Sequence, residues 1–321
     1  MSTASPHAST ERSPLAVVSV SGGKDSTAAA LCALDAHARD HCRFVFADVG
    51  NEHELTLEYV HNDLARVLGP IDVVRADFSK EIAAKRHYVE SEWPAKGVAD
   101  HVVSRALEIL RPTGIPFLDV CLWKGRFPSR RAQFCTQQLK RLPLDAYLLG
   151  LMEQRWAVES WRGLRRDESA ARRDTPDREY VAEGFEIVYP IASWTAQQTI
   201  DFVRARGVPL NPLYSQAMRR VGCMPCINCS KDELHEIARR FPAHIDRIRE
   251  WERLVSFAAK RGWSTFFHDA AREEDTDETI FRRSCIDEKV RWAATARGGR
   301  QLDYLRSTAP AACHSVYGLC E

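Results

Sequence analysis

The sequence predicts an α/β protein with a doubly wound parallel sheet and a helical C-terminal extension. Three observations indicate this class. Short apolar runs alternate with helical runs through the first half of the chain. A glycine-rich turn follows the first apolar run and leads into an alanine-rich helix. After residue 210 the alternation stops, and a cysteine-rich turn and further helices take its place.

The individual elements are expected in an alternating order. Strands are predicted from short apolar runs at residues 15–20, 43–48, 71–74, 155–161 and 185–189. Helices are predicted from periodicity and flanking residues at 26–37, 54–68, 80–110, 136–150, 195–206, 231–240 and 243–261. The helix at 80–110 is expected to break near Trp93-Pro94, and residues 114–131 are expected to be irregular because they contain several Pro and Gly.

The chain is expected to divide into three regions. Residues 1–14 are polar and predict a disordered tail, residues 15–210 form the α/β domain, and residues 211–321 form the cysteine-rich turn and the helical C-terminal region. No apolar run approaches the ~20 residues of a membrane span. The beginning of the chain has no apolar signal core, so a cytoplasmic location without a membrane partner is expected.

The composition excludes little beyond this. Hydrophobic residues make up 45% of the 321 residues and charged residues 28%, which is typical of a soluble globular protein. The formal net charge of +1 gives no global field that would attract nucleic acid, although a local basic patch would be hidden in this sum. The acceptor substrate and the oligomeric state cannot be predicted from this balance.

The turn Ser21-Gly-Gly-Lys-Asp-Ser26 predicts a phosphate site. Its glycines allow backbone N–H groups to point inward, and the helix that follows contributes the positive end of its dipole. Lys24 adds a mobile positive charge, and Ser21 and Ser26 add hydroxyl groups. Asp25 would repel phosphate unless it caps the helix or binds a magnesium ion. The spacing differs from the mononucleotide P-loop, which has four residues between its glycines.

Three cysteines follow at Cys-x2-Cys-x2-Cys spacing, namely Cys223, Cys226 and Cys229. In a cytosolic chain such a cluster indicates metal or redox chemistry more than disulfides. Three close thiolates and a remote fourth are typical of a 4Fe–4S cluster, and a zinc site is the alternative. The remote ligand is expected to be Cys135, because its place at a helix start would lower its pKa.

The other cysteines fall into two groups. Cys285, Cys313 and Cys320 compete with Cys135 for the role of fourth ligand. Three isolated residues are expected to be core or incidental: Cys32, Cys42 and Cys121.

The loop and several later segments together resemble the phosphoadenosine phosphosulfate (PAPS) reductase family, within the PP-loop ATP pyrophosphatase superfamily. In order, these segments begin at Ser21, Asp48, Cys135, Gly163, Tyr189, Pro212 and Gly222, and they cover roughly residues 15–230. The resemblance implies an adenine nucleotide alpha hydrolase-like fold. It also implies that the residues from Ser21 to Ser26, among them Gly22, Gly23, Lys24 and Asp25, hold nucleotide phosphates.

The resemblance assigns further residues to the nucleotide. Asp48 would lie near the adenosine. Phosphate or sulfate oxygens would be bound by Lys140, Arg165, Arg166 and Arg172, and arginine suits this task because it contacts oxyanions bidentately. In the ATP-cleaving branches of the superfamily, Lys24, Asp25, Arg165 and Arg166 would be catalytic.

Two departures from the reductase pattern decide between functions. True PAPS reductases have an eroded first loop, whereas this loop is intact, as in ATP-cleaving branches such as the DNA phosphorothioation sulfurtransferases. The reductases also end in a nucleophilic cysteine, and the neighbours of Cys320 do not match that context.

The leading hypothesis is therefore an ATP pyrophosphatase that uses ATP and Mg²⁺ to adenylate an oxyanion for sulfur transfer, with a 4Fe–4S cluster and a nucleic-acid or sulfur-donor protein partner. One alternative is a PAPS or adenylyl-sulfate reductase that uses Cys320. The other is a non-enzymatic nucleotide or nucleic-acid binding module with a zinc knuckle.

Overall fold

Residues 13–269 and 273–296 are described by the computed structural model, and within them six strands form one sheet in the order β3-β2-β1-β4-β6-β5. The strands are β1 (Leu15–Val20), β2 (Cys42–Ala47), β3 (Ile71–Val74), β4 (Val158–Trp161), β5 (Arg178–Tyr180) and β6 (Glu186–Val188). All neighbouring pairs run parallel except β5 and β6, which are antiparallel. The predicted doubly wound α/β fold is thus confirmed.

The central strand β1 is buried on both faces of the sheet. Ala16 and Val18 pack into one apolar cluster and Leu15 and Val17 into another. This is why the strand shows a continuous apolar run in the sequence and no alternation.

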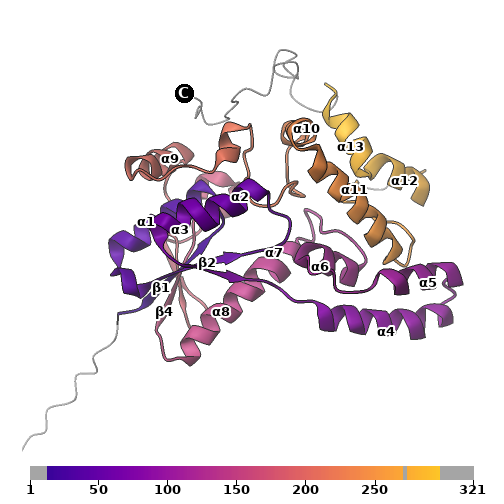
Figure 1. Ribbon diagram of the computed structural model, residues 1–321, viewed down its shortest axis with the longest axis horizontal. Helices are drawn as coiled ribbons and strands as arrows, with labels where there is room; N and C mark the ends of the chain where they lie inside the picture. The colour runs from indigo at the N-terminus through magenta and orange to yellow at the C-terminus, as the bar shows by residue number, and fades with distance from the viewer. Residues whose placement is uncertain (1–12, 270–272, 297–321) are drawn as a thin grey trace, which may run out of the picture.

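Helices cover both faces of this sheet (Figure 1). On one face α1 (Lys24–Ala36) packs against α9 (Ala196–Ala205), and the segment α2 (Glu54–Glu58), a π-helical stretch (Tyr59–Leu64) and α3 (Ala65–Leu68) lies beside them. On the other face lies α8 (Leu142–Glu153), which continues from α7 (Phe134–Thr136) through a second π-helical stretch (Gln137–Arg141).

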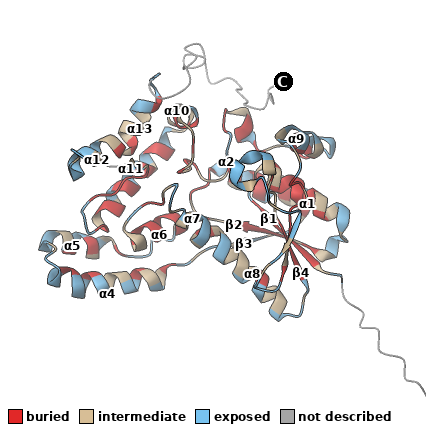
Figure 2. Ribbon diagram, turned by 180° about the vertical axis from the view of Figure 1, so that it is seen from behind, coloured by how far each residue is buried: buried red, intermediate tan, exposed pale blue. Residues whose placement is uncertain are grey.

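The remaining helices form a group beside the sheet (Figures 1 and 2). They are α4 (Ser79–Ala95), α5 (Asp100–Ile109), α6 (Pro116–Lys124), α10 (Lys231–Arg240), α11 (Pro242–Phe257), α12 (Asp277–Ser284) and α13 (Ile286–Ala293). Buried residues from both sides of residue 210 share one apolar cluster in this group. Short 3-10 turns complete the described elements at Arg39–His41, Arg166–Glu168, Ala170–Arg172 and Pro212–Ser215.

One local expectation was wrong. Residues 114–131 were expected to be irregular, but they contain α6, which begins at Pro116 and whose residues Pro116–Leu122 are all buried. Proline is favoured at a first helical position because its missing N–H needs no partner there, so it marks a helix start in this segment. The helix at 80–110 does break near Trp93-Pro94, as predicted: α4 ends at Ala95, and Gly97 with φ +72° follows it.

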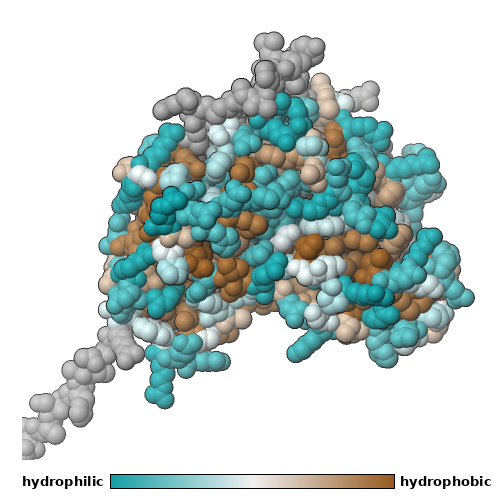
Figure 3. Space-filling view, in the orientation of Figure 1, coloured by the Kyte–Doolittle hydropathy of each residue, from teal (hydrophilic) through white to brown (hydrophobic). Residues whose placement is uncertain are grey.

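Part of the sequence-based prediction falls outside the described residues. Most of the predicted tail lies there, and so do Cys313 and Cys320. Among the described residues, no helix is both long and apolar enough to span a membrane. On the face seen in Figure 3, hydrophilic residues cover most of the surface and hydrophobic residues gather in small groups between them.

Candidate functional site: a glycine-rich loop beside a cysteine knuckle

The loop at residues 21–26 lies at the carboxyl end of β1, between β1 and α1. The chain order of the sheet reverses here, because β2 and β3 extend to one side of β1 and β4 and β6 to the other. Such a switch point leaves a crevice at the carboxyl edge, where α/β sheets bind their ligands. The loop therefore lies at the carboxyl edge of the sheet, where the sequence predicted it.

Hydrogen bonds within the loop hold its shape. The hydroxyl of Ser26 accepts a bond from the backbone N–H of Ser21 at 3.0 Å and donates to the carbonyl of Gly23 at 3.0 Å. Gly22 has φ +73°, a left-handed conformation that favours glycine. The buried side chain of Asn211 donates to the carbonyl of Gly22 at 3.2 Å and so ties the loop to a distant segment.

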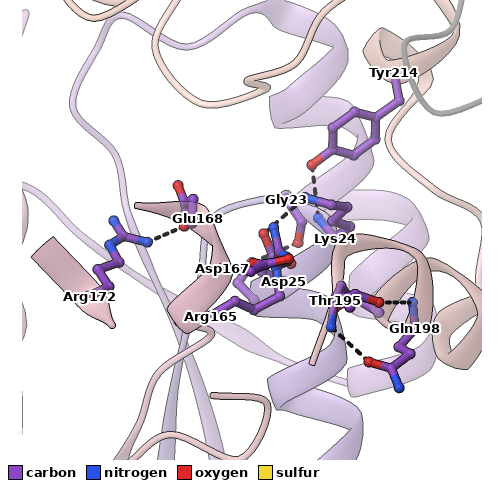
Figure 4. A network of polar contacts seen from close by, with 12 residues as sticks. Gly23, Lys24, Asp25, Arg165, Asp167, Glu168, Arg172, Thr195, Gln198 and Tyr214 are labelled. Atoms are coloured by element: carbon purple, nitrogen blue, oxygen red, sulfur yellow. Dashed lines mark hydrogen bonds and ion pairs between the residues drawn. The ribbon is translucent and has the colours of Figure 1, made fainter. Parts of the chain in front are cut away.

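Asp25 is the centre of an ion-pair network (Figure 4). One carboxylate oxygen accepts from Lys24 Nζ at 3.0 Å, and the other accepts from Arg165 Nε at 2.7 Å. Arg165 also pairs with Asp167 and is buried. Burial lowers the pKa of Arg165, but Asp25 and Asp167 more than offset this, so its pKa is raised overall and the guanidinium stays charged. Asp25 thus pairs with two cations and does not cap the helix.

Gly163 allows this network to form. A Cβ atom at residue 163 would lie 2.4 Å from the carbonyl oxygen of Asp25 and 2.6 Å from the backbone nitrogen of Ser26. The segment after β4 can therefore approach the start of α1 only because residue 163 has no side chain. This close approach brings Arg165 to Asp25.

The other two predicted arginines lie apart from the loop. Arg166 donates to the carbonyl of Thr175 and pairs with Asp177, and Arg172 pairs with Glu168. Figure 4 shows the Arg172 pair separated from the group around Asp25. Of the three arginines, only Arg165 contacts the loop in this structure.

Asp48 directly follows β2, at the same edge of the sheet as the loop. Its carboxylate accepts from the backbone N–H of Gly50 at 2.9 Å and pairs with Arg75 at 3.0 Å. The predicted position at the end of the second strand is therefore seen, while its contact with adenosine stays a prediction.

The cysteine knuckle packs against the segment that follows Asp48. Glu52 and Cys223 form an isolated antiparallel bridge, and the N–H of Met224 donates to the carbonyl of Asn51 at 2.7 Å. The side chain of Asn51 in turn donates to the carbonyl of Pro225 at 3.1 Å. The knuckle thus lies beside the carboxyl edge of the sheet, next to the segment that follows β2.

Cys135, Cys223 and Cys226 gather around Lys140. Burial raises the pKa of the Cys223 thiol to about 12, while the positive charge of Lys140 lowers it and the other two cysteines raise it. Cys223 in turn is the largest contribution that raises the pKa of Lys140, and Glu52 raises it further. Lys140 was assigned to phosphate or sulfate oxygens by the family resemblance, and in the structure it lies among the thiols.

Cys135 was expected to have a lowered pKa at a helix start, but burial and the nearby Cys226 raise its pKa, so that expectation was wrong. Beside Cys135, Cys223 and Cys226, the fourth thiol has two candidates, Cys229 and Cys121. Cys229 is buried, and its N–H donates to the carbonyl of Cys226 at 2.9 Å, but among the predicted ligands only Cys226 affects its pKa. Cys121 is fully buried, and Cys135 is near enough to raise its pKa. Cys121 was expected to be a core or incidental residue, and it does lie in the core. Its closeness to Cys135 was not predicted, because helix α6 was not predicted.

Two histidines, His53 and His244, lie near the knuckle. His53, Glu54 and His244 are the one group of three metal-type ligands within 4.8 Å found among the described residues. However, Nδ1 of His244 lies 2.8 Å from Arg247 Nη2, which can only donate, so the proton of the neutral ring is on Nε2, 3.2 Å from Glu54. Nδ1 of His53 accepts from the N–H of Leu55. These lone pairs are therefore occupied, and the group acts as a hydrogen-bonded connection between α2 and α11.

Comparison with known proteins identifies the family of the chain. The family model described as "Phosphoadenosine phosphosulfate reductase domain" matches residues 15–229. The chain belongs to this PAPS reductase domain family, and the relation supports an enzyme related to those that use sulfonucleotides.

Individual relatives extend this result. A protein of Escherichia phage 186, described as an uncharacterized 37.8 kDa protein in the gpa 5′ region, is 43% identical over 96% of this chain and 97% of its own length. An adenosine 5′-phosphosulfate reductase of Allochromatium vinosum is 36% identical over 100 residues, which are 31% of this chain and 36% of that enzyme. A crystal structure of PAPS reductase from Candida auris covers 65% of this chain and 81% of its own, with a TM-score of 0.40 and 16% identity.

Proposed function

We propose that this protein is an ATP pyrophosphatase that adenylates an oxyanion substrate for sulfur transfer. The observation that carries the proposal is the intact Ser21–Ser26 loop at the switch point of the sheet, with Lys24 and Arg165 both held at Asp25. An intact loop is what the ATP-cleaving branches of the superfamily retain.

The proposed reaction has three steps. An oxygen of the acceptor attacks the α-phosphorus of ATP, the bond from that phosphorus to the oxygen bridging to the β-phosphate breaks, and pyrophosphate leaves with the electron pair. The terminal sulfur of a persulfide then bonds to the acceptor as AMP leaves with the acceptor oxygen, and a second thiol cleaves the resulting S–S bond, which leaves the sulfur on the acceptor and releases a disulfide. Lys24 and Arg165 would stabilise the negative charge that builds on the phosphate oxygens.

Magnesium fits the oxygen atoms around Asp25. Carboxylate and hydroxyl oxygens are the ligands that Mg²⁺ prefers, and the hydroxyls of Ser21 and Ser26 lie 3.1 Å apart next to this carboxylate in the chain. Asp25 would hold the ion, whose positive charge would offset the negative charge of the ATP phosphates. Asp48 would contact the adenosine, and Arg166 and Arg172 would reach the phosphates only after leaving Asp177 and Glu168.

The knuckle fits an iron–sulfur cluster better than a zinc ion. A tetrahedral zinc site with Zn–S of about 2.3 Å needs sulfurs about 3.8 Å apart, whereas among the described residues no three thiols lie within 4.8 Å of one another. A cluster of several irons spans a larger distance. Cys135, Cys223, Cys226 and Cys229 would hold it, Cys121 being the alternative fourth ligand, and the positive charge of Lys140 would balance the thiolates. Bound there, the cluster would bind or deliver sulfur.

A sulfonucleotide reductase is the second candidate. The similarity to adenosine 5′-phosphosulfate reductases favours it. It would require a nucleophilic cysteine, and Cys320, which the sequence suggests for this role, lies outside the described residues.

The proposal is tested by pyrophosphate release from ATP and Mg²⁺ with sulfate, a single-stranded DNA 12-mer or bulk tRNA as the acceptor. Release is expected with one acceptor, and Lys24→Ala should lower its rate at least about 100-fold because a charge contact to the transition state is lost. Arg66→Ala is the matched control, since the side chain of Arg66 is 74% exposed and its one ion pair among the described residues is with Asp63.

Two results would contradict the proposal. One is the absence of pyrophosphate with every acceptor. The other is sulfite release from adenylyl sulfate or PAPS that is lost in Cys320→Ser, which would establish the reductase. Zinc without iron, together with no pyrophosphate, would identify the non-enzymatic binding module.

A further inference from the structure

A cavity of about 770 Å³ lies on the helical side of the knuckle. Its wall is formed by the segment before α7, the end of the knuckle at Cys229, the segment after α11 and the helix α13. None of the residues of the Ser21–Ser26 loop lines it. Its volume lies in the range of sites that hold one small ligand.

The cavity is strongly basic. Arg126, Arg130 and Arg131 line one side, and among the described residues no carboxylate forms an ion pair with any of them. The acidic side chain in the wall, Asp269, is already neutralised by Lys289 at 2.6 Å. The wall therefore carries a surplus of guanidinium groups, which the near-zero net charge of the whole chain conceals.

The opposite side of the cavity is aromatic. Phe266, Phe267 and Trp292 contribute to the wall, and the amino group of Lys231 lies 4.9 Å from the centroid of the Trp292 ring. Trp292 is 38% exposed, so part of its ring is accessible. Arginines that can bind a phosphate and a ring that can stack on a base are the two elements of nucleotide recognition in single strands.

The cavity also connects to the proposed sulfur chemistry. Cys229 belongs to its wall, and Arg130 is near enough to this cysteine to affect its pKa. At the other end of the knuckle, Cys223 pairs with Glu52, four residues after Asp48. The knuckle thus extends from the nucleotide edge of the sheet to the basic cavity.

We propose that this cavity binds a nucleotide unit of the acceptor, with its phosphate on Arg130 and Arg131 and its base on Trp292. The unit is either a free nucleotide or part of a single-stranded nucleic acid, since the recognised chemistry is the same. This inference rests on the proposed function for the role of the ligand as acceptor, whereas the binding itself requires no ATP.

The test is fluorescence anisotropy of a labelled single-stranded DNA 12-mer without ATP, in competition with thymidine monophosphate or inorganic phosphate. The double variant Arg130→Ala/Arg131→Ala should bind at least about tenfold more weakly, and its side chains are exposed, so the fold is retained. Trp292→Ala should weaken binding about tenfold and Trp292→Phe much less, as stacking predicts. Arg66→Ala, an exposed residue away from the cavity wall, should bind like the natural chain.

The outcomes separate the ligand sources and the two proposals. Competition by thymidine monophosphate at similar concentrations supports a free nucleotide, and binding of the 12-mer alone supports a strand. Unchanged binding in the arginine and Trp292 variants overturns the inference, and so does phosphate competing as well as the nucleotide. If the cavity variants weaken binding but ATP yields no pyrophosphate, only the proposed function is contradicted. If ATP yields pyrophosphate but neither probe binds at the cavity, only the inference is overturned.

Discussion

Asp25 shows how one carboxylate can position the cations of a glycine-rich loop. A negative charge in this position would repel phosphate, yet Asp25 holds Lys24 and Arg165 within 3.0 Å. The loop therefore keeps two cations positioned before any ligand is present. A bound magnesium ion would take over the carboxylate and leave both cations to the phosphates.

Gly163 should be as sensitive to substitution as the charged residues. In Gly163→Ala the new methyl group would meet backbone atoms of Asp25 and Ser26 at 2.4–2.6 Å, which no side-chain movement can relieve. We expect the free energy of unfolding to fall by about 2 kcal/mol or more, a typical overpacking cost of 1–3 kcal/mol, and nucleotide binding to weaken. Urea denaturation and isothermal titration with ATP measure the two effects.

Gly150 provides the matched control for this substitution. It lies inside α8, and a Cβ atom there has nothing within 4 Å. Gly150→Ala should therefore stabilise the chain by about 0.5–1 kcal/mol. Equal stability changes in the two variants would refute the close approach of residue 163 to the loop.

The sequence reveals the chemistry of single residues better than their partners. The loop residues, Asp48 and Arg165 lie at the predicted edge of the sheet, because strand order and loop position follow from local patterns. Asn211, whose side chain holds the carbonyl of Gly22, was missed since the two residues are distant in the chain. Nor could the sequence separate Arg165 from Arg166, because that depends on how the segment after β4 turns over Asp25.

At the scale of elements, helix α6 and strand β5 show the limits of pattern recognition. Helix α6 is buried all round, so its apolar residues lack helical periodicity, and its neighbouring prolines and glycines suggest a loop. Strand β5 has only three residues and exists through its pairing with β6. Both elements are determined by tertiary contacts.

The knuckle gives a prediction about metal content. In anaerobically purified protein, Cys223→Ser and Cys226→Ser should reduce iron and sulfide to background, because each removes a thiolate ligand. Cys32→Ser should keep both, since Cys32 packs against the sheet cluster on α1. Comparing Cys229→Ser with Cys121→Ser identifies the fourth ligand by the larger loss of iron. Zinc in place of iron, or full iron in Cys223→Ser, would show the assignment to be wrong.

At the scale of the whole molecule, one apolar cluster unites helices inside the family-matched region with helices that follow it. The ring of Phe117 in α6 stacks on Trp251 in α11, with 5.6 Å between centroids. The helices after residue 229 therefore complete a core that begins at Val49. The predicted boundary at residue 210 separates the chain by composition, while the core crosses it.

This shared core predicts a large effect for a residue far from the loop. Trp251→Ala should lower the free energy of unfolding by about 3–5 kcal/mol, because a buried aromatic ring is lost. Tyr180→Ala should change it by less than about 0.5 kcal/mol, since Tyr180 is 76% exposed. Urea denaturation followed by circular dichroism measures both, and a small effect at Trp251 would contradict a core that spans both regions.

The buried hydrogen bonds of Asn211 have a consequence for how the two sites communicate. Asn211 joins the carbonyl of Gly22 to the hydroxyl of Thr56, and Thr56 donates onward to the carbonyl of Val221 at 2.6 Å, two residues before Cys223. A short series of buried hydrogen bonds thus joins the glycine-rich loop to the knuckle. We expect an occupant that shifts Gly22 to change the affinity of the knuckle for its own occupant, and by thermodynamic reciprocity the effect would be equal in both directions.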